Sequence, residues 1–171
     1  MNMKNSKRPA SARRKIAAPG TRPNFKRILA TTDFSDHSLP GVRYALWLGG
    51  KMGASLDFLH VVEPASLLAG MESVVLVRPD LEVAALARRQ LEALAERETE
   101  GDSKVAAVVR TGKPFHEIAL AARERAADLI VIATHGHTGL KCGWLGRTAE
   151  RVVRHAHGPV LAVRELNRKT L

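Results

Sequence analysis

The 171-residue chain has few aromatic residues and a single cysteine, Cys142. Aromatic side chains make up 4% of the residues, whereas hydrophobic residues of all kinds make up 45%, so the core has to be built from Val, Leu, Ile and Ala. One thiol cannot form an intrachain disulfide, which fits a reducing compartment. No apolar run approaches the roughly 18 residues of a membrane span, and no segment has signal-peptide character, so we expect a cytoplasmic protein.

Motifs of the common catalytic and metal sites are also missing. The sequence contains neither the phosphate-binding Gly-x-x-x-x-Gly-Lys-Ser/Thr motif nor the Gly-x-Ser-x-Gly motif of hydrolases. Two His-x-His pairs, at 135–137 and 155–157, fall outside the predicted strands and have no cysteine or carboxylate at zinc spacing. We therefore expect no bound metal and no catalytic role.

Acidic residues are absent from residues 1–24, which hold seven Lys and Arg residues and three prolines. These residues account for +7 of the formal net charge of +10, which leaves +3 for residues 25–171. The segment has no apolar periodicity, so we expect a disordered basic tail. It is either a solvated extension, a contact for an anionic partner such as nucleic acid, or an organelle-targeting peptide, although its prolines argue against the last.

Apolar runs and helical patterns alternate after residue 25. Each apolar run is short and nearly continuous, which is typical of strands buried on both faces of a parallel sheet. The predicted strands span residues 27–31, 56–62, 104–109, 128–132 and 158–163. Strands that alternate with helices predict right-handed βαβ units, so the sequence indicates an α/β fold with a mostly parallel sheet.

Four helices are predicted between these strands. The first starts near Pro40, and Gly49-Gly50 is expected to end it. Its capping oxygens would come from Ser35, Asp36 and Ser38. Asp80 can cap the long second helix. The apolar stripe of that helix comprises Leu81, Ala84, Ala87, Leu91 and Leu94. Pro114 is expected in the first turn of the third helix, and the fourth covers residues 148–153.

The most informative segment joins the fourth predicted strand to the last helix. Four glycines fall within eleven residues: Gly136, Gly139, Gly143 and Gly146. Glycine lets backbone N–H groups approach a phosphate closely, and the N-terminus of a helix adds partial positive charge. The segment therefore predicts a phosphate or nucleotide site, while a plain strand-to-helix connection remains the alternative.

A second polar loop, Thr31-Thr32-Asp33, follows the first predicted strand. Ligands of open parallel sheets bind beyond the carboxyl ends of the strands, where the strand order reverses. If the first and fourth strands are neighbours, this loop and residues 135–146 line one crevice. Asp33 could then accept hydrogen bonds from a ribose or a base, and its structural alternative is to cap the following helix.

Several segments, in this order and at this spacing, resemble the universal stress protein family. They are residues 28–35, 59–62 and 127–136, followed by 145–146 and 159–163. The resemblance covers about residues 25–165. It implies a doubly wound five-stranded parallel sheet, Rossmann-like and of the adenine nucleotide alpha hydrolase-like type, with strand order 3-2-1-4-5. It also implies a homodimer joined through the strand between Pro159 and Val163. We place this domain at residues 25–166, between the basic tail and a short C-terminal tail of residues 167–171.

The resemblance further implies an ATP site, because one branch of the family binds ATP through a glycine motif. That motif is Gly, two residues, Gly, nine residues, Gly and then Ser or Thr. The corresponding positions hold Ala133, Gly136, Gly146 and Arg147. Ala133 is a mild change only if its φ is negative, and Arg147 replaces a hydroxyl by a cation that could pair with phosphate. The predicted nucleotide-binding residues are Thr31, Thr32, Asp33, Val61, Ile132, Ala133, Gly136, Gly139, Gly146, Arg147 and Thr148.

Three functions follow from these observations. The first is a cytoplasmic stress-response regulator that binds ATP, with or without Mg²⁺, and hydrolyses it at most slowly and incidentally. The second is a dimeric stress protein that binds no nucleotide and works through protein partners, as the departures at Ala133 and Arg147 allow. The third is association with nucleic acid through the basic tail.

Overall fold

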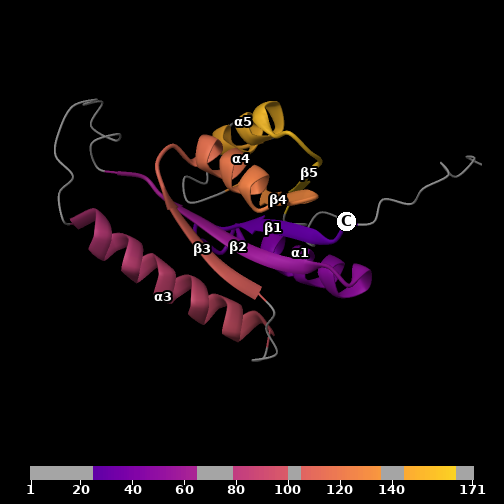
Figure 1. The fold of residues 1–171 in the computed structure, drawn as a ribbon, viewed down its shortest axis with the longest axis horizontal. Coiled ribbons are helices and arrows are strands. Elements are labelled where there is room, and N and C mark those ends of the chain that lie inside the picture. The colour runs from indigo at the N-terminus through magenta and orange to yellow at the C-terminus, as the bar shows by residue number, and fades with distance from the viewer. Residues whose placement is uncertain (1–24, 65–78, 100–104, 136–144, 165–171) are drawn as a thin grey trace, which may run out of the picture.

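The computed structural model describes residues 25–64, 79–99, 105–135 and 145–164 (Figure 1). Strands and helices alternate along these residues. In chain order they are β1 (Arg27–Thr31), α1 (Leu39–Met52), β2 (Ser55–Val62), α3 (Pro79–Thr99), β3 (Val105–Thr111), α4 (Pro114–Glu124), β4 (Leu129–Ala133), α5 (Arg147–His155) and β5 (Val160–Val163). The five strands run parallel in the order β3-β2-β1-β4-β5. The predicted α/β fold and strand order are confirmed.

Helices cover both faces of the sheet (Figure 1). α1 and α3 pack on one face, where Phe58 and Leu91 lie in the centre of the first core cluster. α4 and α5 pack on the other face, where Leu59 and Val152 belong to the second cluster. All five residues of β4 are buried. Burial on both faces explains why the strands appear in the sequence as nearly continuous apolar runs.

The first helix continues past its predicted end at Gly49-Gly50. α1 runs to Met52, and Gly53, with a φ of 66°, adopts the left-handed conformation that ends it. Gly49 serves packing instead, because a Cβ there would lie 2.2 Å from Cδ1 of Leu56. The prediction was wrong because a glycine needed for helix-to-strand contact has the same appearance in a sequence as one that ends a helix.

Two predicted caps are also wrong. Ser38 occupies the N-cap position of α1, but its side chain makes no capping hydrogen bond. α3 begins at Pro79, so Asp80 lies inside the helix rather than before it. Of the predicted apolar stripe of α3, Leu91 is buried, whereas Leu81 is 76% exposed. The helix meets the core only from Ala87 onward.

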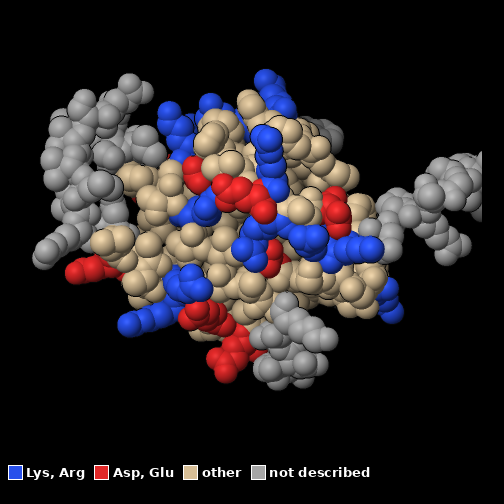
Figure 2. Space-filling model, viewed as in Figure 1, with Lys and Arg blue, Asp and Glu red and all other residues tan. Residues whose placement is uncertain are grey.

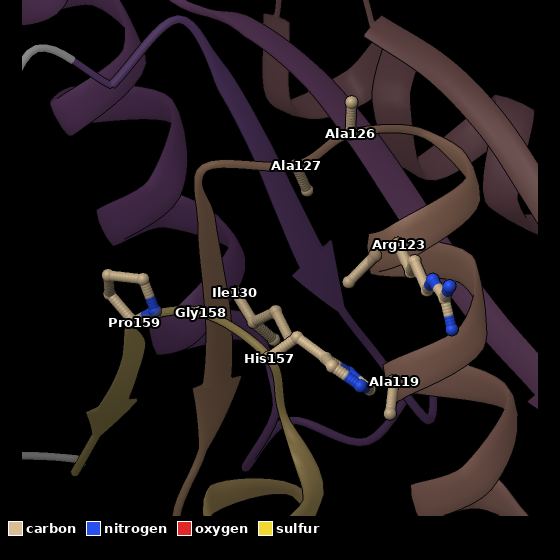
Figure 3. Close-up of a pocket in the computed structure, with 9 residues that line it drawn as sticks. Ala119, Arg123, Ala126, Ala127, Ile130, His157, Gly158 and Pro159 are labelled. Atoms are coloured by element: carbon tan, nitrogen blue, oxygen red, sulfur yellow. The ribbon is translucent and has the colours of Figure 1, made fainter.

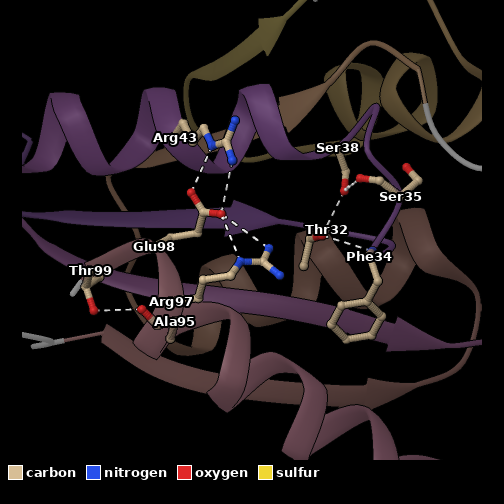
Figure 4. Close-up of polar contacts among 9 residues, drawn as sticks. All are labelled: Thr32, Phe34, Ser35, Ser38, Arg43, Ala95, Arg97, Glu98 and Thr99. Atoms are coloured by element: carbon tan, nitrogen blue, oxygen red, sulfur yellow. Dashed lines mark hydrogen bonds and ion pairs between the residues drawn. The ribbon is translucent and has the colours of Figure 1, made fainter. Parts of the chain in front are cut away.

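One ion pair links the two helices on the first face (Figure 4). Nε of Arg43 on α1 lies 2.8 Å from Oε2 of Glu98 on α3. The hydrogen bond from Arg43 lowers the pKa of Glu98 and raises the pKa of Arg43. Because the Arg43 side chain is mostly exposed, solvent screens the pair, and we assign the stability of this face to its apolar core.

Candidate functional site

The candidate site lies where two neighbouring strands end. β1 pairs with β4, with Ala30 opposite Val131, and the strand order reverses between these two strands. Residues 32–33 continue from the carboxyl end of β1, and residues 134–135 continue from that of β4. The first and fourth strands are therefore neighbours, as a shared crevice requires.

The loop after β1 is held by a chain of hydrogen bonds (Figure 4). The Ser38 hydroxyl donates to the carbonyl oxygen of Ser35 at 2.8 Å. The Thr32 hydroxyl lies 2.8 Å from that of Ser38 and accepts the backbone N–H of Phe34 at 3.0 Å. Phe34 has a φ of 64°, which costs roughly 1–2 kcal/mol for a residue with a side chain. These bonds hold the loop in that conformation.

Asp33 takes part in the same turn. Its Oδ1 accepts the backbone N–H of Ser35 at 3.1 Å and the Ser35 hydroxyl at 2.5 Å. These bonds hold the turn before α1 and do not cap the helix, whose N-cap position is Ser38, so the structural alternative predicted for Asp33 was wrong in its detail. Thr31 at the end of β1 lies opposite Leu59 in the sheet, and Val61 lies two residues further along β2.

His60 supports this loop from β2 and was not among the predicted site residues. Its Nδ1 lies 2.9 Å from the carbonyl oxygen of Thr32, and since a carbonyl can only accept, Nδ1 carries the proton. The imidazole stacks on the Phe34 ring with centroids 4.2 Å apart. Burial lowers the pKa of His60, and the hydrogen bond to Thr32 and the charge of Asp33 oppose this only in part. A polar residue within an apolar strand was the one signal in the sequence.

We expect His60 to make the domain less stable in mild acid. The pKa of His60 is lower in the folded chain than its ordinary value of 6.5, so the unfolded chain binds the proton first as the pH falls. The free energy of unfolding therefore decreases between about pH 6.5 and the lower pKa of the folded chain. Urea unfolding at about pH 7.5 and about pH 5 should show a smaller pH-dependent loss for His60→Gln than for the original chain. His116→Gln, at an exposed histidine on α4, is the control. Equal losses in the original chain and His60→Gln would contradict this assignment.

Ala133 ends β4 with a negative φ, because the only non-glycine residues with positive φ in the described part of the chain are Phe34 and Ala126. Alanine in place of the family's glycine is therefore free of backbone strain here. α1 approaches this strand end closely: a Cβ on Gly41 would lie 3.2 Å from the backbone nitrogen of Ala133.

Gly146 connects the end of β4 to the start of α5. Its N–H donates to the carbonyl oxygen of Thr134 at 2.7 Å. A Cβ on Gly146 would lie 2.9 Å from the same oxygen, so any other residue would force the two segments apart. Gly146 at the N-cap position of α5 offers no side chain to cap it, so among the described residues no capping side chain competes for the N–H donors of its first turn.

The other predicted site residues lie in the first turn of α5, in the strands, or outside the described residues. Arg147 and Thr148 are exposed in the first turn of α5, and Arg147 makes no ion pair within the described ranges. Thr31 and Ile132 are buried in their strands, and Val61 is half-buried. Two predicted residues, Gly136 and Gly139, lie outside the described residues, and so does Cys142.

The sequence model described as the universal stress protein family matches residues 24–164. The chain belongs to the universal stress protein family. A curated relative, universal stress protein MJ0531 of Methanocaldococcus jannaschii, is 35% identical over 144 residues, which are 82% of this chain and 83% of the relative. The family assignment that the sequence motifs predicted is thus confirmed.

Solved structures of the family share the fold. The structure of protein MJ0577 has a TM-score of 0.70 at 24% identity and covers 84% of this chain and 99% of its own. A universal stress protein from Archaeoglobus fulgidus, solved in complex with dAMP, has a TM-score of 0.59 at 18% identity and covers 82% of this chain and 99% of its own. Within the described residues of the present chain, no helix is long and apolar enough to cross a membrane. Those residues also contain no group of three metal-ligating side chains.

Proposed function

We propose that this universal stress protein binds an adenine nucleotide, ATP first, at the carboxyl ends of β1 and β4. The observation that carries the proposal is the contact between Gly146 and Thr134, which brings the N-terminus of α5 to the carboxyl end of β4, where the strand order reverses. Helix N-termini at such points favour phosphate groups, because their N–H donors and the helix dipole both attract anions. The archaeal relative that binds dAMP supports an adenine nucleotide in this fold.

The predicted site residues form two groups, one for each end of such a nucleotide. The first turn of α5, with Arg147 and Thr148, would hold the phosphates. Asp33 in the loop after β1 and Val61 near the end of β2 would contact the ribose and the base. Mg²⁺ would enter with the phosphates rather than on a preformed protein site. We propose a cytoplasmic regulator whose state follows nucleotide occupancy, with no catalytic role.

Thermal unfolding tests whether the phosphates matter. A ligand at a hundred times its Kd stabilises the folded state by about 2.7 kcal/mol, which corresponds to roughly 5–11 °C in Tm for a chain of this length. ATP should raise the Tm by that order, whereas adenosine at the same concentration should raise it much less. A larger rise in Tm with adenosine than with ATP would mean that the base supplies the binding energy, and it would contradict a phosphate site at α5.

A second candidate function is supported by Arg147. The family's ATP-binding branch has Ser or Thr at this position, and a long side chain at the start of α5 can occupy the space of a phosphate. In that case the protein would act through partners without a nucleotide. Arg147→Ser distinguishes the two functions, because it would then create ATP binding rather than preserve it.

We also propose that the chain forms a homodimer through β5. This strand is a sheet edge, and Val160, Leu161 and Val163 are only half-buried in the single chain. Val153 on α5 and Tyr44 on α1, from the helices that pack against β5, are 50% and 42% exposed. An open strand edge with apolar side chains on both flanks is an aggregation hazard unless a partner covers it, and a symmetric pair is the commonest solution.

Leu161→Asp should weaken this dimer by placing a charge in the interface. Light scattering at micromolar concentration should report a dimer for the original chain and a larger monomer fraction for the variant. Leu81→Asp is the matched control. Leu81 is 76% exposed on α3, which packs on β3 at the opposite edge of the sheet from β5. A monomeric original chain at that concentration would refute the β5 interface.

A further inference from the structure

A second concave site lies at the opposite end of the sheet from the nucleotide loops. Its cavity of about 120 Å³ lies between the turn before β4 and the segment before β5 (Figure 3). Both segments precede their strands, so the cavity is at the amino ends of β4 and β5, whereas Asp33 and Gly146 lie at the carboxyl ends. Nothing in the nucleotide proposal involves this cavity, and the following inference does not depend on that proposal.

The floor of the cavity is apolar and its rim is cationic. Ile130, which is 3% exposed, and four alanines supply the apolar surface: Ala119, Ala122, Ala126 and Ala127. The polar side chains in the lining are those of Arg123 and His157, and no acidic residue lines the cavity. Figure 3 shows the His157 imidazole extending toward the α4 residues Ala119 and Arg123.

Neither polar side chain has a partner of its own. Within the described part of the chain, Arg123 and His157 make no side-chain hydrogen bond or ion pair. The carboxylates nearest to Arg123 in sequence are occupied elsewhere. Glu124 pairs with Arg110, and Asp128 accepts the backbone N–H groups of Lys26 and Arg27.

The carbonyl groups at the end of α4 do not cancel this positive charge. The oxygens of Ala122 and Arg123 accept the backbone N–H groups of Ala127 and Ala126. Those bonds form within a turn in which Ala126 has a φ of 49°. The end of the helix is thus capped by the chain itself, and the guanidinium of Arg123 remains the strongest charge at the cavity.

We propose that this cavity binds a small organic monocarboxylate. The planar guanidinium of Arg123 matches a carboxylate with two parallel hydrogen bonds, and His157 can donate a third. The alanines and Ile130 would take the aliphatic part of the ligand. A volume of about 120 Å³ equals the share of about four water molecules, which suits a ligand with a chain of a few carbons. Inorganic phosphate would pair with Arg123 but leave the apolar floor uncovered.

Titration of the nucleotide-free protein with butyrate, followed by amide chemical shifts in NMR, tests the proposal. We expect saturable shifts at residues 119–127 and 157–158 with a Kd on the order of 1 mM, since so few ligand atoms give only modest affinity. Butyramide, which has the same shape without the charge, and inorganic phosphate should bind at least about tenfold more weakly.

Two variants separate the charge from the apolar floor. Arg123→Gln should weaken butyrate binding by about tenfold, whereas Arg89→Gln, at an exposed arginine on α3 without an ion pair in the described ranges, should leave it unchanged. Ala119→Leu should fill the cavity and abolish the shifts. Absent or unsaturable shifts with butyrate, equal binding of butyramide or phosphate, or full binding by Arg123→Gln would each overturn the proposal.

Discussion

Arg147→Ala should weaken ATP binding by about ten- to a hundredfold while changing the affinity for adenosine much less. Arg147 lies in the first turn of α5 without an ion pair in the described residues, so its guanidinium can pair with a phosphate at the helix N-terminus. A charge-assisted pair of this kind contributes roughly 1.5–3 kcal/mol, which corresponds to that change in Kd. Isothermal titration of the original chain and the variant with ATP and with adenosine measures both effects.

Two further variants complete this test. Arg147→Ser restores the residue of the family's ATP-binding branch and should keep or improve the affinity. Arg89→Ala removes an exposed charge on α3 and should change nothing. If all of these proteins bind ATP equally well, Arg147 points to solvent and its phosphate contact is refuted. If the original chain binds no ATP and Arg147→Ser gains binding, Arg147 blocks the site and the partner-dependent function is correct.

Gly146→Ala should cost stability and ATP affinity together. The added methyl group would lie 2.9 Å from the carbonyl oxygen of Thr134, so the start of α5 has to move away from β4. Forcing a methyl group into such a contact typically costs about 1–3 kcal/mol, or roughly 2–4 °C in Tm for each kcal/mol. The same movement displaces the N–H donors of α5, and ATP binding should fall by at least about tenfold.

Gly50→Ala is the matched control for this substitution. Gly50 lies inside α1, and a Cβ there would meet no atom within 4 Å. Alanine is favoured over glycine in a helix, so this variant should gain up to about 1 kcal/mol and bind ATP normally. Equal Tm values and equal ATP affinities for the two variants would mean that the close approach of Gly146 to Thr134 is not required.

The arrangement of strands and helices could be predicted largely from local patterns. Short apolar runs such as residues 128–132 report burial on both faces, and proline at positions such as Pro114 marks the first turn of a helix. The strand order came from resemblance to the family rather than from any single residue, because periodicity does not tell which strands are neighbours. Once the order is given, the meeting of the β1 and β4 loops follows.

Features that depend on tertiary contact could not be predicted. Gly49 packs on Leu56, and nothing in its local sequence distinguishes that role from ending a helix. The positive φ of Phe34 and the stacking of His60 on its ring arise only when β2 lies beside the loop after β1. Gly146 was predicted as a phosphate-binding glycine, whereas its described contact is with Thr134, a residue of the preceding loop that sequence spacing alone does not reveal.

The central claim is that the crevice between β1, β4 and the start of α5 binds ATP. Isothermal titration of the unmodified chain with ATP and Mg²⁺ tests it most directly. We predict saturable binding of one nucleotide per chain, weakened by Asp33→Ala at the ribose and base end and by Gly146→Ala at the phosphate end. A chain that is folded and dimeric by light scattering, yet releases or absorbs no heat with ATP, ADP or AMP, would contradict the account.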